Sequence, residues 1–225
     1  PAAVLHDIPD VDLIREVRAE MGGRKHNQVT CVGNSKWGIN QGFDDHKGFH
    51  SVIKPLSTLF EQHNQCTYID VIDSAMGRKS NIEVLRTIHA SSLLLHSSVS
   101  EGTGLPILEA LGLGVTPITT DVGIAGEILG MHRRLIIPRD PTVFHSIVHQ
   151  ELLAPSLSNE EAIEIFEKHI YSISNEKFPT DFQKVTNDIH WLQPSFLVKI
   201  KISSIWMVRF FKNVPKHKSA LIKRL

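Results

Sequence analysis

The stretch from His96 to Gly123 reads HSSVSEGTGLPILEALGLGVTPITTDVG and places two carboxylates around a glycine turn. Glu101 precedes Gly102 and Gly104, and Glu109 follows one turn inside a short helical pattern. Glycine lets a backbone approach a ligand closely, and a helix start points unpaired amides and positive dipole at it. Because carboxylates accept hydrogen bonds, beside such amides they suit sugar hydroxyls. The stretch therefore predicts a site for a sugar nucleotide.

Strand-like and helical segments alternate on both sides of this stretch. Apolar runs typical of buried strands cover residues 28–33, 66–72, 92–98, 115–120 and 134–138. Helical patterns lie at 11–23, 47–64, 81–91, 123–129 and from Pro106 onward. Such alternation predicts an α/β fold, a Rossmann-like parallel sheet with helices on both faces. Ligands of these sheets bind at the carboxyl ends of the strands, where the Glu101 loop is expected.

Several local expectations concern the helices. Pro55 should kink the helix at 47–64 because it lacks the amide hydrogen. Asn81 is the expected cap of the next helix. Further helices are predicted at 142–153, 158–173 and 180–192, the second opening with Ser158 and Glu161 in capping-box spacing.

Composition excludes several classes of protein. The 225 residues hold 24 Lys+Arg and 24 Asp+Glu, a balance that gives no indication of nucleic-acid binding. The only cysteines, Cys31 and Cys66, lie in apolar runs typical of a reducing compartment. No signal peptide or apolar run of membrane-spanning length is visible, so a cytoplasmic protein is expected. The 13 histidines form no metal-ligand pattern, so no metal site is predicted.

The end of the chain differs from the rest. No acidic residue occurs in 189–225, and apolar residues alternate with lysines there. We therefore divide the chain into a nucleotide-sugar-binding domain at 1–185 and a basic amphipathic helical tail at 186–225. The tail packs on the sheet or on a partner domain, or residues 196–225 lie on an anionic membrane surface. The second alternative places the protein at the inner face of the membrane.

The opening stretch resembles the E-x7-E signature of retaining glycosyltransferases with the GT-B fold (glycosyltransferase family 4, group 1). His96 and Ser97 occupy the place of the family's Pro-Ser, and Lys47 with Gly48 resembles its Lys-Gly step. The resemblance covers roughly residues 25–150 and is most specific across 96–127. The matching positions of the signature are Glu101, Gly102, Gly104, Leu105, Pro106, Glu109, Ala110, Gly114, Pro117, Asp121, Gly123 and Glu127.

This resemblance implies the C-terminal, donor-binding half of a transferase that moves a sugar from a UDP- or GDP-linked donor with retention of configuration. Acceptors would be glycans, lipids or proteins, as in polysaccharide, glycolipid or glycoprotein assembly. Glu101 is implied beside the donor sugar and Lys47 at the departing diphosphate, both as catalytic residues, and no metal cofactor is implied. The implied donor-binding residues are Gly33, Asn34, Lys36, Gly102, Thr103, Gly104, Leu105 and Glu109, the last on the ribose.

Several differences from the family pattern keep other functions open. Asn34 replaces an arginine, with Lys36 as a substitute, and Thr103 replaces an aromatic residue. The chain is short between the second and third strands, where the family shapes its base pocket. The chain starts at Pro1, so we expect a fragment that lacks the acceptor-binding domain. A binding or scaffold module without turnover and a related sugar-phosphate epimerase are therefore the alternatives.

Four further features of the sequence carry less weight. Met76–Asn81 (MGRKSN) lacks the upstream glycine of a phosphate loop. Asp44, Asp45 and His46 are consecutive and would not converge on a metal ion. No G-x-G-x-x-G follows the first strand, which argues against a dinucleotide enzyme. His89 and His96 are interpreted as structural rather than catalytic residues.

Overall fold

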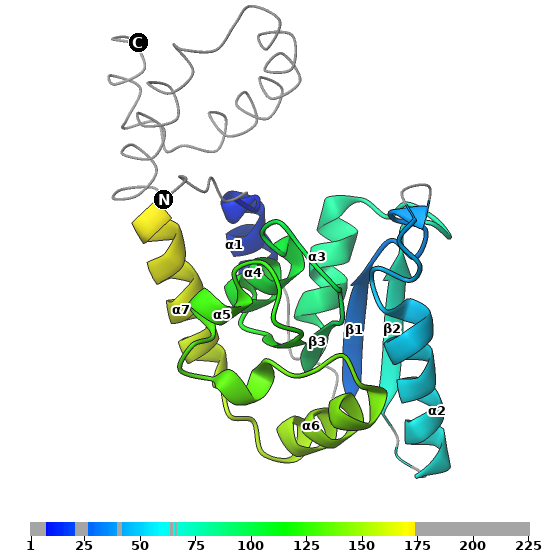
Figure 1. The fold of residues 1–225 in the computed structure, drawn as a ribbon. Helices are drawn as coiled ribbons and strands as arrows, with labels where there is room; N and C mark the ends of the chain where they lie inside the picture. Colours follow the sequence, from blue (N-terminus) through cyan, green and yellow to red (C-terminus); the bar gives the residue numbers. More distant parts are fainter. Residues whose placement is uncertain (1–7, 21–26, 40–41, 64, 66, 174–225) are drawn as a thin grey trace, which may run out of the picture.

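The computed structural model describes residues 8–20, 27–39, 42–63, 65 and 67–173 (Figure 1). At its centre lies a sheet of four strands in the order β2-β1-β3-β4, and every pair is parallel. The strands are β1 (Gln28–Gly33), β2 (Tyr68–Asp73), β3 (Leu93–His96) and β4 (Thr116–Thr119). The predicted Rossmann-like α/β sheet is confirmed.

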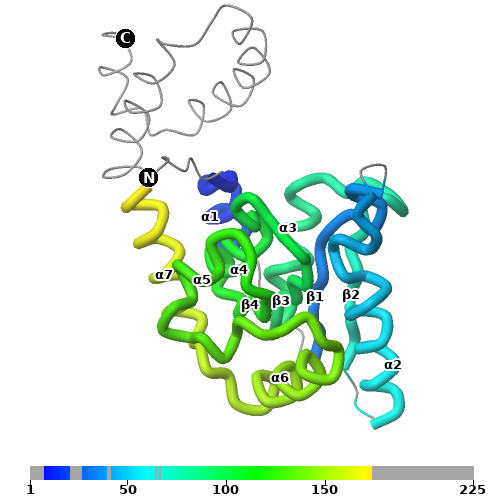
Figure 2. Tube along the Cα trace, viewed as in Figure 1, coloured from blue at the N-terminus to red at the C-terminus, as the bar shows by residue number. Residues whose placement is uncertain are grey.

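Helices pack in two groups around this sheet (Figures 1 and 2). One group consists of helices that contact one another in series, α1 (Val11–Glu20), α3 (Asn81–His89), α4 (Leu105–Gly112) and α7 (Asn159–Ser172). The second group consists of η2 (Phe49–Ile53), α2 (Lys54–Gln62) and α6 (Pro141–Leu153). Two short elements, α5 (Ala125–Ile128) and η3 (Arg133–Leu135), follow β4. Because helices cover both faces, β3 and β4 are buried along their whole length.

Close packing holds α4 against its neighbours. A Cβ added at Gly112 would lie 2.8 Å from Ile14 of α1 and 3.1 Å from the Phe166 ring of α7. Both of these side chains are fully buried. The helix that carries Glu109 is therefore fixed in the core by contacts on two sides.

The helix at 47–64 differs from its predicted form. Its first turn, Phe49–Ile53, is a π-helix, and α2 then begins at Lys54 with Pro55 in its first turn. Amides of a first helical turn lack partners within the α-helix, so proline costs little there. Pro55 thus lies within a helical segment, as expected, just after the change of helix type, and the expected kink stays a prediction.

The sequence predicts one helix cap correctly, misplaces another and overestimates the length of one strand. Ser158 accepts a hydrogen bond from the Glu161 amide, as predicted. The prediction for Asn81 is wrong, because Ser80 and Glu83 form a capping box one residue earlier. The strand expected at 134–138 is reduced to one parallel bridge between Thr119 and Ile136, after the 3-10 turn η3. The helix at 180–192, the boundary at residue 185 and the tail lie outside the described residues.

A histidine cluster between α2 and α6 should make stability depend on pH. The rings of His63 and His145 have centroids 4.9 Å apart, and Gln65 lies 2.9 Å from His145 Nε2 and 3.1 Å from His149 Nδ1. Burial, with added repulsion from His63 and His149, lowers the pKa of His145. The unfolded chain therefore binds more protons, and stability falls as the pH drops below the ordinary histidine value of 6.5.

We expect His145→Gln to reduce this loss of stability between pH 7.5 and 5.5 by a small amount, because the ring keeps solvent contact. Thermal melts of both proteins across that range measure it. An identical pH slope in the variant would show that His145 does not carry the effect.

Candidate functional site

The predicted site residues lie along the carboxyl edge of the sheet. Gly33 ends β1, and the loop with Glu101 follows β3. Gly104, with φ 82°, is the N-cap of α4, so the loop turns directly into the helix. α4 starts at Leu105, and Pro106 is its second residue. The start of α4 thus lies at the edge where parallel sheets bind their ligands.

Lys47 and Glu101 form an ion pair at this edge. Lys47 Nζ lies 2.5 Å from Glu101 Oε1, and the two side chains are only 18% and 15% exposed. Gly33 lies beside the pair, since an added Cβ would be 3.5 Å from Lys47 Cγ. Three predicted residues from separate segments therefore meet in one place.

Glu101 is ionised at neutral pH. Burial by itself would raise the pKa of Glu101, but hydrogen bonds from His96, Lys47 and Ser98 and the charge of His96 lower it to about 2. His96 Nε2 lies 3.4 Å from Glu101 Oε1, at the end of β3. With so low a pKa the side chain serves as an acceptor and a negative charge, and it has no proton to donate.

The loop before η2 docks onto the end of β3 and so positions Lys47. Ser97 Oγ donates to the Lys47 carbonyl at 2.9 Å, and the Val99 amide donates to the His46 carbonyl at 2.9 Å. His46 Nε2 lies 2.7 Å from the Ser100 carbonyl. The Lys47–Glu101 pair is thus held by contacts of its backbone neighbours.

Arg139 ties the same two loops together. Its Nε donates to the Ser97 carbonyl at 3.0 Å, and one terminal nitrogen contacts the Asp45 carbonyl and lies 3.3 Å from Asp45 Oδ2. Asp45 also accepts hydrogen bonds from the His50 and Ser51 amides at the start of η2. Asp45 and His46 therefore contribute to the structure of this loop.

The turn before α4 is fixed from the other side. The Thr103 carbonyl accepts from the Ile124 amide at 3.1 Å. Gly123, with φ 55°, passes so close that an added Cβ would lie 2.7 Å from the Thr103 carbonyl carbon. Thr103 is buried, Gly102 is exposed and Glu109 is half-buried within α4.

Asn34 and Lys36 are not brought into the pair. The Asn34 side chain accepts a hydrogen bond from the Lys36 amide at 2.9 Å, so it shapes the loop itself. Lys36 is exposed beside Asp73 at the end of β2. Their contact with a donor stays a prediction.

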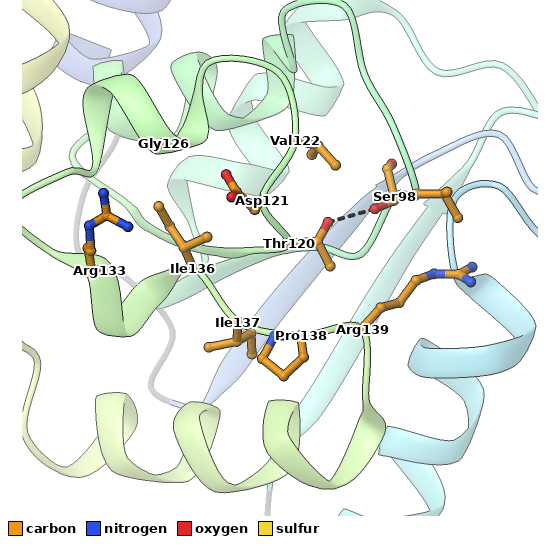
Figure 3. A pocket seen from close by; sticks show the side chains of 11 residues that line it. Ser98, Thr120, Asp121, Val122, Gly126, Arg133, Ile136, Ile137, Pro138 and Arg139 are labelled. Atoms are coloured by element: carbon orange, nitrogen blue, oxygen red, sulfur yellow. Dashed lines mark hydrogen bonds between the residues drawn. The ribbon is translucent and has the colours of Figure 1, made fainter.

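A pocket of about 590 Å³ adjoins the pair on the side of β4 (Figure 3). Ser98 lines it and also hydrogen-bonds Glu101. Thr120 Oγ1 donates to the Ser98 carbonyl at 2.6 Å, which joins the loops after β3 and β4 (Figure 3). Asp121 and Arg133 bring charges of both signs to its wall. The edge is thus hollowed beside the carboxylate, with mixed polar and apolar walls.

Neither a metal-ligand cluster nor a membrane-spanning helix occurs among the described residues. Within the described ranges, no three His, Cys, Asp or Glu side chains are arranged to hold a metal ion. None of the helices in that part of the chain is long and apolar enough to cross a membrane.

Comparisons with known proteins bear on this edge. Residues 74–163, which include Glu101, Glu109 and the start of α4, match the family described as glycosyl transferases group 1. The part of the chain that carries both glutamates is therefore similar to this family. A comparison with curated proteins gave no match.

Two solved structures share the fold of this chain. A sucrose-phosphate synthase from Thermosynechococcus elongatus has a TM-score of 0.53 at 13% identity, over 83% of this chain and 52% of its own. A UDP-forming alpha,alpha-trehalose-phosphate synthase from Burkholderia vietnamiensis has a TM-score of 0.52 at 12% identity, over 85% of this chain and 53% of its own. The chain therefore spans about half the length of these glycosyltransferases of the GT-B fold.

The group 1 segment also contains site residues that sequence reasoning missed. His96 was interpreted as structural, yet it contacts Glu101 from the buried end of β3. Its position at the end of a predicted strand, five residues before Glu101, could have indicated that it lies near the site. Arg139 gave none, because 94 residues separate it from Asp45 and only the folded chain joins them.

Proposed function

We propose that this chain is the donor-binding half of a retaining glycosyltransferase that uses a UDP- or GDP-linked sugar. The observation that carries the proposal is the Lys47–Glu101 pair at the start of α4 in a group 1 segment. The span of about half of the compared structures supports a second, acceptor-binding half in the complete protein. Glycans, lipids or proteins remain the proposed acceptors.

In the proposed reaction the bond between the anomeric carbon and the diphosphate breaks, the acceptor oxygen bonds to the same face of that carbon, and the hydroxyl proton passes to the departing diphosphate. Lys47 and the first amides of α4 offset the charge of the departing diphosphate. Glu101, held ionised, faces the donor sugar, where positive charge develops as the bond breaks. Without a donor, the two charges neutralise each other at 2.5 Å, so donor binding exchanges one anionic partner of Lys47 for another.

The remaining donor contacts are proposed from the matched signature. Glu109 accepts hydrogen bonds from the ribose hydroxyls, and Gly104 and Leu105 present amides to the sugar and diphosphate. The other proposed contacts, which line the carboxyl edge or its loops, are Gly33, Asn34, Lys36, Gly102 and Thr103.

The test is nucleotide binding to the 225-residue chain by titration calorimetry. We expect UDP, GDP or one of their sugar conjugates to bind, and Glu109→Ala to weaken binding about tenfold, the effect of losing one charge-assisted hydrogen bond. Glu160→Ala, at the exposed start of α7, is the matched control and should change nothing. A wild-type chain that binds none of these nucleotides contradicts the proposal.

A binding or scaffold module without turnover is the second candidate. β2 is an edge strand of the described sheet, and its Tyr68 and Val71 are 65% and 42% exposed. This exposure is consistent with the short chain between β2 and β3, where the family shapes its base pocket. Donor binding without product formation, in a protein that carries both halves, favours this candidate.

A further inference from the structure

An exposed aromatic shelf lies beside the ion pair. We define it as Trp37, Ile39 and Phe43, which are 46%, 49% and 48% exposed. They belong to the loop between β1 and Lys47. Adjacent exposed apolar side chains of this size are typical of binding surfaces rather than of a solvated loop.

Contacts with the His46 ring hold the two aromatic side chains of the shelf in place. The Trp37 ring packs on the buried His46 ring with centroids 4.3 Å apart, and Phe43 meets the same ring edge-on at 5.6 Å. The Phe43 amide donates to the Gly38 carbonyl at 3.0 Å, which joins Phe43 to the residue after Trp37. Since His46 itself is anchored to Ser100, the rings are presented in a fixed orientation.

The same loop lies at the carboxyl edge of the sheet. The Ser35 amide donates to Asp73 Oδ1 at 2.9 Å, and the Ser74 amide donates to the Gly33 carbonyl at 3.0 Å. These contacts join the ends of β1 and β2. The shelf therefore borders the crevice in which the donor is proposed to lie.

Lys47 connects the shelf to the carboxylate. Its Nζ lies 5.5 Å from the Trp37 ring centroid and 2.5 Å from Glu101 Oε1. A sugar nucleotide consists of a sugar, a diphosphate and a nucleoside, in that order. The contacts Glu101, Lys47 and Trp37 follow one another in the same order, as a carboxylate, a cation and an aromatic ring.

We infer that Trp37, supported by Phe43, stacks on the base of the nucleotide whose diphosphate binds Lys47; this rests on the proposed function. Aromatic rings bind bases through their flat faces without a need for specific hydrogen bonds. A protein partner fits less well, because the centres of protein interfaces are depleted of charged residues and this shelf adjoins Lys47. The shelf supplies base-binding surface on the side of the sheet where β2 is the edge strand of the described part.

The test compares Trp37→Ala, Trp37→Phe and wild type in the full 225-residue chain. Calorimetry measures the Kd of UDP, GDP and ADP, with inorganic pyrophosphate as a probe that lacks a base. Tyr171→Ala, which removes a 63% exposed ring from α7, is the matched control. In Figure 1, α7 and β2 lie at opposite sides of the domain.

We expect Trp37→Ala to raise the Kd of the tightest nucleotide about tenfold or more, the usual effect of losing one stacked base. Trp37→Phe should recover most of the affinity, and Tyr171→Ala and pyrophosphate binding should not respond. The inference is overturned if Trp37→Ala leaves nucleotide affinity intact, if Trp37→Phe binds as poorly as Trp37→Ala, or if pyrophosphate weakens equally. A wild-type chain that binds no nucleotide overturns the proposed function as well, whereas unchanged tight binding in Trp37→Ala overturns the shelf alone.

Discussion

Glu101→Gln is expected to lower turnover about 100-fold or more, the range for removing one group placed at developing charge. Glutamine keeps the size of the side chain and an acceptor oxygen, so donor affinity should change much less. The negative charge is what is lost, and in the donor-free chain hydrogen bonds from His96, Lys47 and Ser98 hold the pKa of this carboxyl at about 2 against the effect of burial.

The measurement is kcat and donor Kd in a protein that carries both halves, with Glu109→Ala alongside. Glu109→Ala should act mainly on donor Kd, because ribose contacts are made equally in the ground and transition states. If both variants reduced kcat and affinity by similar factors, the roles given to the two glutamates would be wrong.

Gly48→Ala is expected to destabilise the fold by roughly 2–5 kcal/mol, the sum of left-handed strain and overpacking. Gly48 has φ 78°, and an added Cβ would lie 2.7 Å from the Ser97 carbonyl oxygen and 2.9 Å from its Cβ. Ser97 cannot shift to make room, because its hydroxyl donates to the Lys47 carbonyl and its own carbonyl accepts from Arg139 Nε. The same change should weaken nucleotide binding, since Lys47 is the preceding residue.

Gly42→Ala is the matched control for this prediction. Gly42 has φ 82°, but no atom lies within 4 Å of an added Cβ. It should cost about 1–2 kcal/mol from backbone strain alone. Urea unfolding of both variants separates the two effects. Equal losses would show that the loop of Lys47 does not dock on Ser97 as described.

The fold could be predicted from helix and strand patterns because these patterns depend on neighbouring residues. Apolar runs such as 92–98 and the turn of Gly102 and Gly104 are read from neighbouring residues, and parallel connectivity then follows. Errors occurred where an element's end depends on distant contacts. The 134–138 segment is a good strand by composition, yet only Ile136 bridges to Thr119.

By itself, the sequence determined the parallel sheet, the edge that carries the Glu101 loop and the start of α4 beside it. These follow from periodicity and from the backbone preferences of glycine and proline, which act over a few residues. Only the tertiary structure decided that Lys47, 54 residues before Glu101, meets it at 2.5 Å, and that His96 and Arg139 belong to the same site. Such contacts depend on how two loops dock across the sheet edge, and no local pattern encodes a distance between segments so far apart in the chain.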